Sequence, residues 1–251
     1  MILDRIVART RERIAGLPLL PPENGSAARR SLRRAIESAR ERNAVIAELK
    51  YASPSRGVLE SGIHPGTLAE ELAAGGCVAL SVLTEPYFFG GSTENIGHVR
   101  RVSGLPILRK DFIIDEKQLY ETKALSADAV LLIAGVLGSD LPAFVQIAYE
   151  IGLEPLVEVH SRNEAEQALR TDAELIGINN RNLTTMTIDL NTTKRLSGMI
   201  RQEGRMVVSE SGILWPFDVR NLRDSCDAFL IGSAVMAAEN RKKRLEGLVY
   251  A

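Results

Sequence analysis

The sequence has few cysteines and no long apolar run, and both shortages exclude classes of protein. Cys77 and Cys226 are the only cysteines among 251 residues, too few for a disulfide framework or a zinc cluster. Both are expected to be reduced, mostly buried thiols of a cytoplasmic protein. No apolar run is long enough to span a bilayer. Residues 1–5 also lack the basic start and apolar core of a signal peptide.

An excess of charge of either sign is also lacking. The chain has 31 basic and 32 acidic residues, with a formal net charge of −1. No global field therefore attracts nucleic acid or an anionic membrane, and neither is expected as a partner. An anionic small-molecule ligand must then be met by local charges and backbone amides. The length and ordinary composition of the chain are sufficient for a large buried core.

Short apolar runs and helical patterns alternate along most of the chain. Two helices, over 2–17 and 27–40, are expected to precede a first strand at 44–50. Further strands are expected at 78–83, 106–110, 128–133, 154–159, 174–179, 205–210 and 227–231. The helices that follow the strands are expected at 65–74, 92–102, 116–125, 139–151, 161–170, 190–201, 213–223 and 233–248.

These eight units predict an α/β fold, a single (β/α)8 TIM barrel over residues 1–251 in which 1–42 form an N-terminal helical extension. A doubly wound open sheet is the alternative, but no Gly-x-Gly-x-x-Gly turn follows the first strand. In a TIM barrel the active site lies at the carboxyl ends of the strands, so residues there are the first candidates for chemistry.

The first strand ends in an acid and a base on one face. Glu48 and Lys50 are two residues apart, and side chains on a strand alternate between its faces. Burying such a pair is costly unless it is paired, so it indicates either a structural ion pair or a functional site. Four later strands repeat the pattern and end in Lys110, in Glu158, in Asn179 with Arg181, and in Glu210. Ionisable or amide side chains at five strand ends predict a functional site.

Two turns of small residues follow the last two strands. Ser211-Gly212 ends the seventh strand, and Gly232-Ser233 ends the eighth where the final helix begins. Small residues let backbone amides approach an anion, and TIM barrels often hold a phosphate at this position. Gly-Ser also suits an ordinary helix start, but two such turns in adjacent loops favour a phosphate site.

Histidine and tryptophan do not indicate a ligand site. His64, His98 and His160 share no spacing for a metal, so structural or surface roles are favoured and no metal site is expected. Trp215 is expected to pack, and 241–244 is expected to be a solvated basic helix face.

Longer stretches around the strand ends form a recognisable pattern. They are 46–57 (IAELKYASPSRG), 81–85, 89–92, 108–115 (LRKDFIID), 127–133, 156–160 (LVEVH), 176–183, 208–213 and 231–233. With these stretches and the two N-terminal helices, the chain resembles the indole-3-glycerol phosphate synthases, the ring-closing decarboxylases of tryptophan biosynthesis. Tyr51 and Pro86-Tyr87 depart from the family pattern and are interpreted as tolerated variation.

The resemblance implies a reaction and its acid–base groups. The substrate would be 1-(2-carboxyphenylamino)-1-deoxyribulose 5-phosphate, and the products indole-3-glycerol phosphate, carbon dioxide and water, without cofactor or metal. Lys110 would be the main general acid, with its pKa lowered by a crowded cationic site. Glu158 would be a base or hydroxyl partner. Glu48 and Lys50 would work as a pair, with Lys50 also meeting the substrate carboxylate or phosphate.

The resemblance also implies substrate contacts. Asn179 and Arg181 would orient the substrate and Glu48, and Glu210 would hold a substrate hydroxyl or a lysine. Loop 52–63 is expected to close over the site as a lid. Ser53, Ser211, Gly212, Gly232 and Ser233 would hold the phosphate, and Phe112, Leu83 and Leu131 would form the wall around the anthranilate ring.

Two rival functions stay open from the sequence. A lysine at a strand end can form a Schiff base with a ketose phosphate, as in class I aldolases, and borohydride trapping would separate that enzyme from the synthase. A barrel that binds a sugar phosphate without turning it over is the second rival, although the five strand-end groups argue against it. Phosphoribosylanthranilate isomerase is less favoured, since its cysteine–aspartate pair is not evident. A monomer or weak homodimer is expected.

Overall fold

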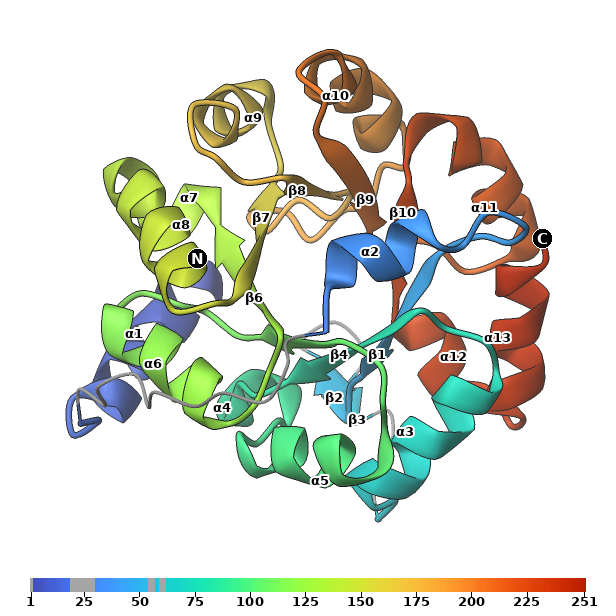
Figure 1. The fold of residues 1–251 in the computed structure, drawn as a ribbon, viewed down its shortest axis with the longest axis horizontal. Coiled ribbons are helices and arrows are strands. Elements are labelled where there is room, and N and C mark those ends of the chain that lie inside the picture. Colours follow the sequence, from blue (N-terminus) through green and yellow to red (C-terminus); the bar gives the residue numbers. More distant parts are fainter. Residues whose placement is uncertain (1, 19–29, 54–56, 59–61) are drawn as a thin grey trace.

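Eight parallel strands close into a barrel in the computed structural model, which describes residues 2–18, 30–53, 57–58 and 62–251. The strands are β1 Val45–Leu49, β4 Ala79–Leu83, β5 Ile107–Lys110, β6 Ala129–Ile133, β7 Glu154–Val159, β8 Leu175–Asn179, β9 Met206–Glu210 and β10 Ala228–Ile231. Each pairs with the next barrel strand, and β10 pairs with β1 to close the ring (Figure 1). The predicted strands and TIM-barrel fold are confirmed.

Helices cover the outside of the barrel, as parallel strands require crossover connections (Figure 1). They are α3 Pro65–Ala74, α5 Glu94–Val102, α6 Glu116–Ala124, α8 Leu141–Glu150, α9 Arg162–Ala168, α10 Asn191–Gln202, α11 Pro216–Leu222 and α13 Arg241–Val249. Short elements that were not predicted lie in the loops: the hairpin β2 Ala52–Ser53 with β3 Gly57–Val58, helices α4 Pro86–Phe89 and α7 Ala134–Leu137, and the 3-10 turns η1 Gly138–Asp140 and η2 Arg223–Ser225.

The predicted final helix, 233–248, is wrong as a single element. It consists of α12 Ser233–Met236 and α13, with a break between them. The Asn240 side chain accepts a hydrogen bond from the backbone N–H of Lys243 at 2.8 Å and so begins a new helix. The break contains neither proline nor glycine, which is why the helical pattern appeared continuous.

The two N-terminal helices lie at opposite ends of the barrel. Helix α2, Leu32–Glu37, is held at the amino end by Glu154 at the start of β7, which accepts hydrogen bonds from Ser31 Oγ at 2.7 Å and Leu32 N at 2.6 Å. Helix α1, Ile2–Ile14, lies at the carboxyl ends of the strands, beside the cavity described below. Both are shorter than predicted, and residues 27–29 lie outside the described part of the chain.

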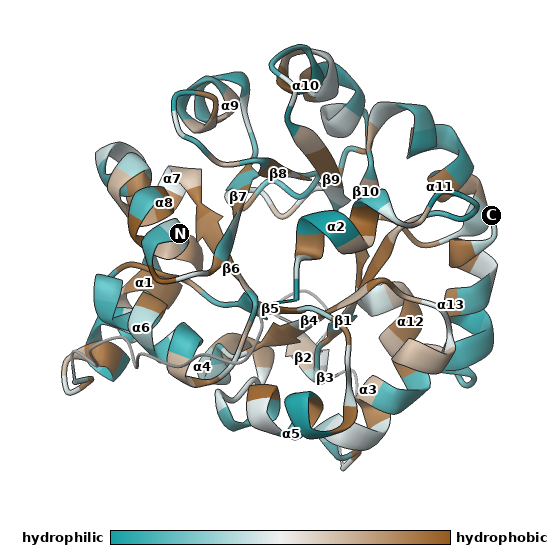
Figure 2. Cartoon of the chain, in the orientation of Figure 1, coloured by the Kyte–Doolittle hydropathy of each residue, from teal (hydrophilic) through white to brown (hydrophobic). Residues whose placement is uncertain are grey.

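Strand side chains alternate between two apolar cores, one between barrel and helices and one inside the barrel. In Figure 2 the strands are largely brown, whereas teal residues gather on the outer faces of the helices. Ile46 and Leu108 lie in the inner core. Glu48 and Lys110, two residues later on the same strands, therefore point into the barrel as well.

The first and last strands of the barrel are joined along their length. Val45 on β1 lies opposite Phe229 on β10. Just before β1, the backbone N–H of Asn43 donates to the carbonyl of Val249 at 2.9 Å, and the Asn43 side-chain amide donates to the carbonyl of Ala251 at 3.4 Å. Residues near the end of α13 therefore help to fix the start of the barrel.

Two remaining expectations concern cysteines and membranes. Cys77 and Cys226 are free and buried, and burial raises the pKa of each thiol to about 12, as befits inert structural thiols. Within the ranges that the structure describes, no helix combines the length and apolar character needed to cross a bilayer.

Candidate active site

A cavity of about 340 Å³ opens at the carboxyl ends of the barrel strands. Its lining includes most of the residues singled out from the sequence: Glu48, Lys50, Leu83, Lys110, Phe112, Leu131, Glu158, Asn179, Arg181, Ser211, Gly212, Gly232 and Ser233. Ser53 belongs to β2, but its side chain lies outside the description, as does much of the predicted lid 52–63. Most of the residues predicted at the strand ends therefore border one cavity, whereas Glu210 lies beside Lys110 without being part of the lining.

Lys110 lies at the centre of the charged part of the cavity. Its Nζ is 2.5 Å from Glu210 Oε2, 3.5 Å from Glu158 Oε2 and 3.9 Å from Glu48 Oε2. Lys50 Nζ is 2.6 Å from the other oxygen of Glu48, so the two side chains form an ion pair, and their joint role in the reaction stays a prediction. Strands β1, β5, β7 and β9 thus aim two ammonium groups and three carboxylates at one point.

Two glycines make room for these carboxylates. A Cβ atom at Gly177 on β8 would overlap Glu210, and one at Gly232 after β10 would overlap Glu48. Glycine inside or directly after a strand often marks such a close approach. Gly177 was not singled out from the sequence, although its place within an apolar strand was a usable signal.

The predicted charge around Lys110, and with it the predicted direction of its pKa shift, is wrong. The sequence interpretation placed it in a cationic site that lowers its pKa. Burial does act in that direction, but the carboxylates of Glu210, Glu158 and Glu48 outweigh it and raise the pKa of Lys110. The ammonium group is consequently protonated at neutral pH.

Glu158 is held ionised by its neighbours. Burial opposes ionisation, but Lys110, His160 and a hydrogen bond from Asn179 together lower the pKa of Glu158 to about 2. Asn179 thus orients Glu158, whereas the expectation had it orient Glu48. The Asn179 Oδ1 also accepts a hydrogen bond from the backbone N–H of Arg181 at 3.0 Å, and the Arg181 guanidinium donates to the carbonyl of Met186 at 3.3 Å.

Glu210 has the opposite tendency. It has no exposed surface, and burial, together with the nearby charges of Glu158 and Glu48, raises its pKa to about 7 against the pull of Lys110. Its Oε1 has no hydrogen-bond partner within the part of the chain that the structure describes. Glu210 therefore holds Lys110, one of the two roles expected of it, and its contact with a substrate hydroxyl stays a prediction.

His160 was expected to be structural or on the surface, and the structure places it inside, against Glu158. Its side chain is only 14% exposed, and its Nε2 is 3.2 Å from Glu158 Oε1. The other two histidines fit the expectation: His64 caps α3, and its ring meets that of His98 edge-on at 4.6 Å. In the described ranges no group of three or more His, Cys, Asp or Glu side chains is placed to hold a metal.

The two small-residue turns are neighbours in space because β9 and β10 pair in the barrel. Ser211 and Gly212 both have left-handed backbone conformations, with φ of 64° and 85°. Gly232 precedes the short helix α12, which begins at Ser233. All four residues border the cavity. This side of the cavity is therefore built from sharply turning backbone and small side chains.

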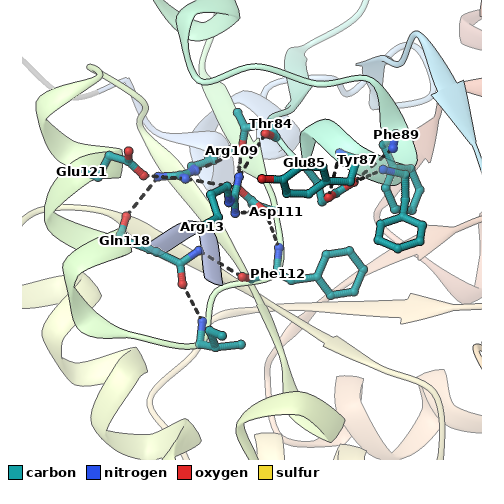
Figure 3. Close-up of polar contacts among 12 residues, drawn as sticks. Arg13, Thr84, Glu85, Tyr87, Phe89, Arg109, Asp111, Phe112, Gln118 and Glu121 are labelled. Atoms are coloured by element: carbon teal, nitrogen blue, oxygen red, sulfur yellow. Dashed lines mark hydrogen bonds and ion pairs between the residues drawn. The ribbon is translucent and has the colours of Figure 1, made fainter. Parts of the chain in front are cut away.

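A second polar network, missed from the sequence, lies on the outer face of β5 (Figure 3). Arg109 is 1% exposed and donates to Thr84 Oγ1 at 3.1 Å and to Asp111 Oδ2 at 3.1 Å. Asp111 also accepts a hydrogen bond from the backbone N–H of Phe112 at 2.8 Å. The Gln118 side chain donates to the carbonyl of Phe112 at 3.0 Å. The network therefore fixes the backbone on both sides of Lys110 and at Phe112.

Helix α1 is tied to this network through arginines spaced four residues apart. Arg13 donates to both oxygens of Asp111 at 2.9 Å (Figure 3). The guanidinium groups of Arg9 and Arg5 lie 5.9 and 5.7 Å from the ring centroids of Tyr87 and Phe88. Ile2, Leu3 and Ile6 of the same helix line the cavity.

The basic stretch 241–244 and Trp215 differ in part from expectation. Trp215 is 59% exposed, and the Arg244 guanidinium lies 4.1 Å over its ring. Arg244 also donates to the carbonyl of Leu214 at 2.6 Å, and Arg241 lies 3.5 Å from Glu71. These two arginines are therefore packed and not freely solvated.

Comparisons with known proteins agree with the geometry. The family model described as indole-3-glycerol phosphate synthase matches residues 3–248. An indole-3-glycerol phosphate synthase of Burkholderia ambifaria (strain MC40-6) is 44% identical, covering 99% of both chains. One of Carboxydothermus hydrogenoformans is 45% identical over 87% of this chain and 84% of its own.

Solved structures with low sequence identity share the fold. A tryptophan synthase alpha chain from Legionella pneumophila has a TM-score of 0.63 at 12% identity, over 88% of this chain and 96% of its own. A thiamine phosphate pyrophosphorylase from Pyrococcus furiosus has a TM-score of 0.60 at 18% identity, over 84% and 95% of the two chains. These likenesses show a common barrel and carry no information on the reaction.

Proposed function

The chain belongs to the indole-3-glycerol phosphate synthase family, and on that premise we propose a division of roles among the charged groups of the cavity. The reaction closes the ring of 1-(2-carboxyphenylamino)-1-deoxyribulose 5-phosphate, with loss of carbon dioxide and water, to give indole-3-glycerol phosphate in tryptophan biosynthesis. It needs an acid for the ribulose carbonyl, an acid for the departing hydroxyl, and a base for a proton of the intermediate.

Lys110 is the acid of the ring-closing step. The observation that carries this role is its central place, with its Nζ within 4 Å of three carboxylates. The raised pKa keeps the ammonium protonated until the aromatic carbon attacks the carbonyl. The alkoxide that then develops is far more basic than an amine, so proton transfer from Lys110 remains favourable. Loss of carbon dioxide restores the aromatic ring.

Glu158 is the base of the dehydration step, and the first step prepares it. In the resting site its carboxylate is stabilised by Lys110, 3.5 Å away, which makes it a weak base. Once Lys110 has given up its proton, that attraction disappears and the pKa of Glu158 rises. Glu158 then removes a proton from the intermediate, while Lys50, held by Glu48, donates one to the departing hydroxyl.

The remaining residues bind and orient the substrate. The apolar side chains of Leu83, Phe112 and Leu131 enclose the anthranilate ring and exclude water. Asn179, Arg181 and Glu210 contact the polar chain of the sugar. The phosphate is held by Ser53, Ser211, Gly212, Gly232 and Ser233, with Lys50 meeting a substrate anion.

The phosphate position is tested by a structure with inorganic sulfate. The anion is expected at the backbone amides of Gly212, Gly232 and Ser233. An anion seated instead at Arg241–Arg244 would contradict the placement.

We also propose a compartment and an oligomeric state. The enzyme is cytoplasmic, which the free buried thiols support, and it acts as a monomer or weak homodimer. No nucleic acid or membrane partner and no cofactor is needed for the proposed acid–base chemistry, which the side chains of the cavity supply.

The test of the acid role is Lys110→Ala, with indole formation followed by fluorescence. The value of kcat should fall by about two to four orders of magnitude while KM changes much less, the effect of losing a general acid. Lys194→Ala, on the exposed face of α10, is the matched control and should leave kcat within about twofold. A kcat for Lys110→Ala within about tenfold of the parent would assign the acid role elsewhere. Borohydride with substrate should trap no imine, whereas trapping would favour the Schiff-base rival.

A further inference from the structure

The end of β7 and the start of α9 carry a chain of three titratable groups in contact, of which the roles above use only the first, the buried Glu158. Glu158 is 3% exposed, and its Oε1 lies 3.2 Å from His160 Nε2. His160 Nδ1 lies 3.2 Å from Glu164 Oε2 on α9. We propose that His160, held as an imidazolium by Glu164, is a positioning residue that keeps Glu158 ionised during turnover. This inference rests on the proposed role of Glu158 as the base.

Glu164 holds His160 by two contacts to one carboxylate oxygen. Besides facing Nδ1, Glu164 Oε2 accepts a hydrogen bond from the backbone N–H of His160 at 2.8 Å. Glu164 is itself fixed in the first turn of α9, where Ser161 caps the helix by accepting from its backbone N–H at 3.3 Å. The ring therefore has a set orientation, with Nδ1 toward Glu164 and Nε2 toward Glu158.

The two carboxylates favour a charged ring. A neutral imidazole has one N–H and would face one carboxylate with a lone pair, whereas the imidazolium has a proton for each. The contacts to Glu158 and Glu164 accordingly raise the pKa of His160 to about 10, although burial opposes this. The Nε2–Glu158 contact is too poorly aligned for a regular hydrogen bond, so it acts as an ion pair.

The two carboxylates beside Lys110 provide an internal comparison. Both Glu158 and Glu210 are buried, and both lie near Lys110 and Glu48. Glu158 has His160 as a second cation and a pKa lowered to about 2, whereas Glu210 has no such neighbour in the described ranges and a pKa raised to about 7. The groups facing Glu158 are Lys110 on β5, Glu48 on β1, Asn179 on β8, Glu210 on β9 and His160.

His160 matters most after Lys110 has transferred its proton. At that point Glu158 would be left among the negative charges of Glu48 and Glu210, and it would take up a proton from any donor before meeting the intermediate. The charge of His160, anchored outside the cavity by Glu164, prevents this. It also favours release of the proton that Glu158 has taken, so that the base is ionised again for the next turnover.

The test is the pH profile of kcat for His160→Gln, because kcat reports the groups that titrate in the bound complex. The acid limb should move upward by at least one pH unit, so that activity at pH values on that limb falls by about tenfold or more while activity at pH 8.5 stays within about threefold. Glu164→Gln should move the limb in the same direction by less. His98→Gln, which removes a histidine outside the site, is the control and should leave the profile unchanged.

Two further outcomes separate this inference from the role of Glu158 itself. In a Glu158→Gln background, adding His160→Gln should cost less than about threefold, because the residue through which it acts is gone. If Glu158→Gln alone retains activity within about tenfold, the proposed base is wrong. If Glu158→Gln is inactive but the acid limb of His160→Gln coincides with that of the parent, the role of His160 is overturned. Should His160→Gln fail to fold by circular dichroism, the limb of Glu164→Gln decides in the same way.

Discussion

Strand β5 carries a buried polar network on each face, and the two differ in how completely their charges are paired. On the outer face, each oxygen of Asp111 accepts at least two hydrogen bonds, and Arg109 contacts Thr84, Thr122 and Glu121 besides Asp111. On the inner face, Lys110 meets three carboxylates, and Glu210 Oε1 lacks a hydrogen-bond partner in the described chain.

Within residues 109–112, charged groups therefore serve two purposes: one network stabilises the structure, and the other has the properties of a reactive site. In a network in which each group is paired, the protonation states are stable, and the network fixes the backbone. A network with more carboxylates than close cations holds groups with shifted pKa values, which is a property of active sites. The outer network therefore fixes the backbone around Lys110 and Phe112, whereas the inner network holds the groups to which acid–base roles are proposed.

The largest expected effect comes from breaking the outer network with Arg109→Met. This change removes the ion pair with Glu121 and leaves Arg13 as the cation that faces the buried Asp111, and it should lower the free energy of unfolding by about 3–5 kcal/mol. Urea denaturation measures the loss. Arg162→Met, which removes an arginine whose side chain is 77% exposed, should change stability by less than about 0.5 kcal/mol. Equal losses for the two variants would mean that the outer network is not structural.

The next effect is the pH dependence of the free energy of unfolding that Glu210 of the inner network causes. The pKa of Glu210 is raised to about 7 in the folded protein, so the folded protein retains a proton that the unfolded chain releases near pH 4.5. Its stabilising contribution is therefore complete below pH 4.5 and is lost as the pH rises through 7. Between pH 4.5 and 8, Glu210→Gln should gain on the order of 3 kcal/mol relative to the parent. A constant difference in unfolding free energy between the two proteins would refute the assigned shift.

The smallest effect is expected where the outer network reaches α1. Arg13→Met removes the two hydrogen bonds to Asp111 from a side chain that is 19% exposed, and should cost about 1 kcal/mol of stability. Because Ile2, Leu3 and Ile6 line the cavity, KM should rise severalfold while kcat changes less. Arg11→Met, on the exposed face of the same helix, serves as control. An unchanged KM would mean that α1 does not depend on Arg13 for its place at the cavity.

Residues along a strand were predictable, whereas contacts between strands were not. The alternation of apolar and polar residues placed Glu48, Lys50, Lys110 and Glu158 inside the barrel, and all of them line one cavity. The direction of the pKa shift of Lys110 was predicted wrongly. It depends on three carboxylates that are up to 162 positions apart in sequence and meet only in the closed barrel.

Two other misses have physical causes of their own. Arg109 and Asp111 flank Lys110 in sequence but face the other way, so their partners come from α1, the loop after β4, and α6. His160 follows the last residue of its strand, where periodicity no longer indicates direction. The proposed positioning role of His160 depends on its contacts with Glu164, four residues later on α9, and with Glu158.

The pairing of β1 with β10 also determines when the barrel can close during synthesis of the chain. Val45 finds Phe229 only after 184 further residues have been made, which takes about 10–40 s at ribosomal rates of roughly 5–20 residues per second. Until then β1 has an unpaired edge, which is a template for association with other nascent chains. Gly232, the residue that makes room for Glu48, is likewise synthesised 184 residues after it. A nascent chain on the ribosome therefore cannot have a complete active site before its last strand has emerged.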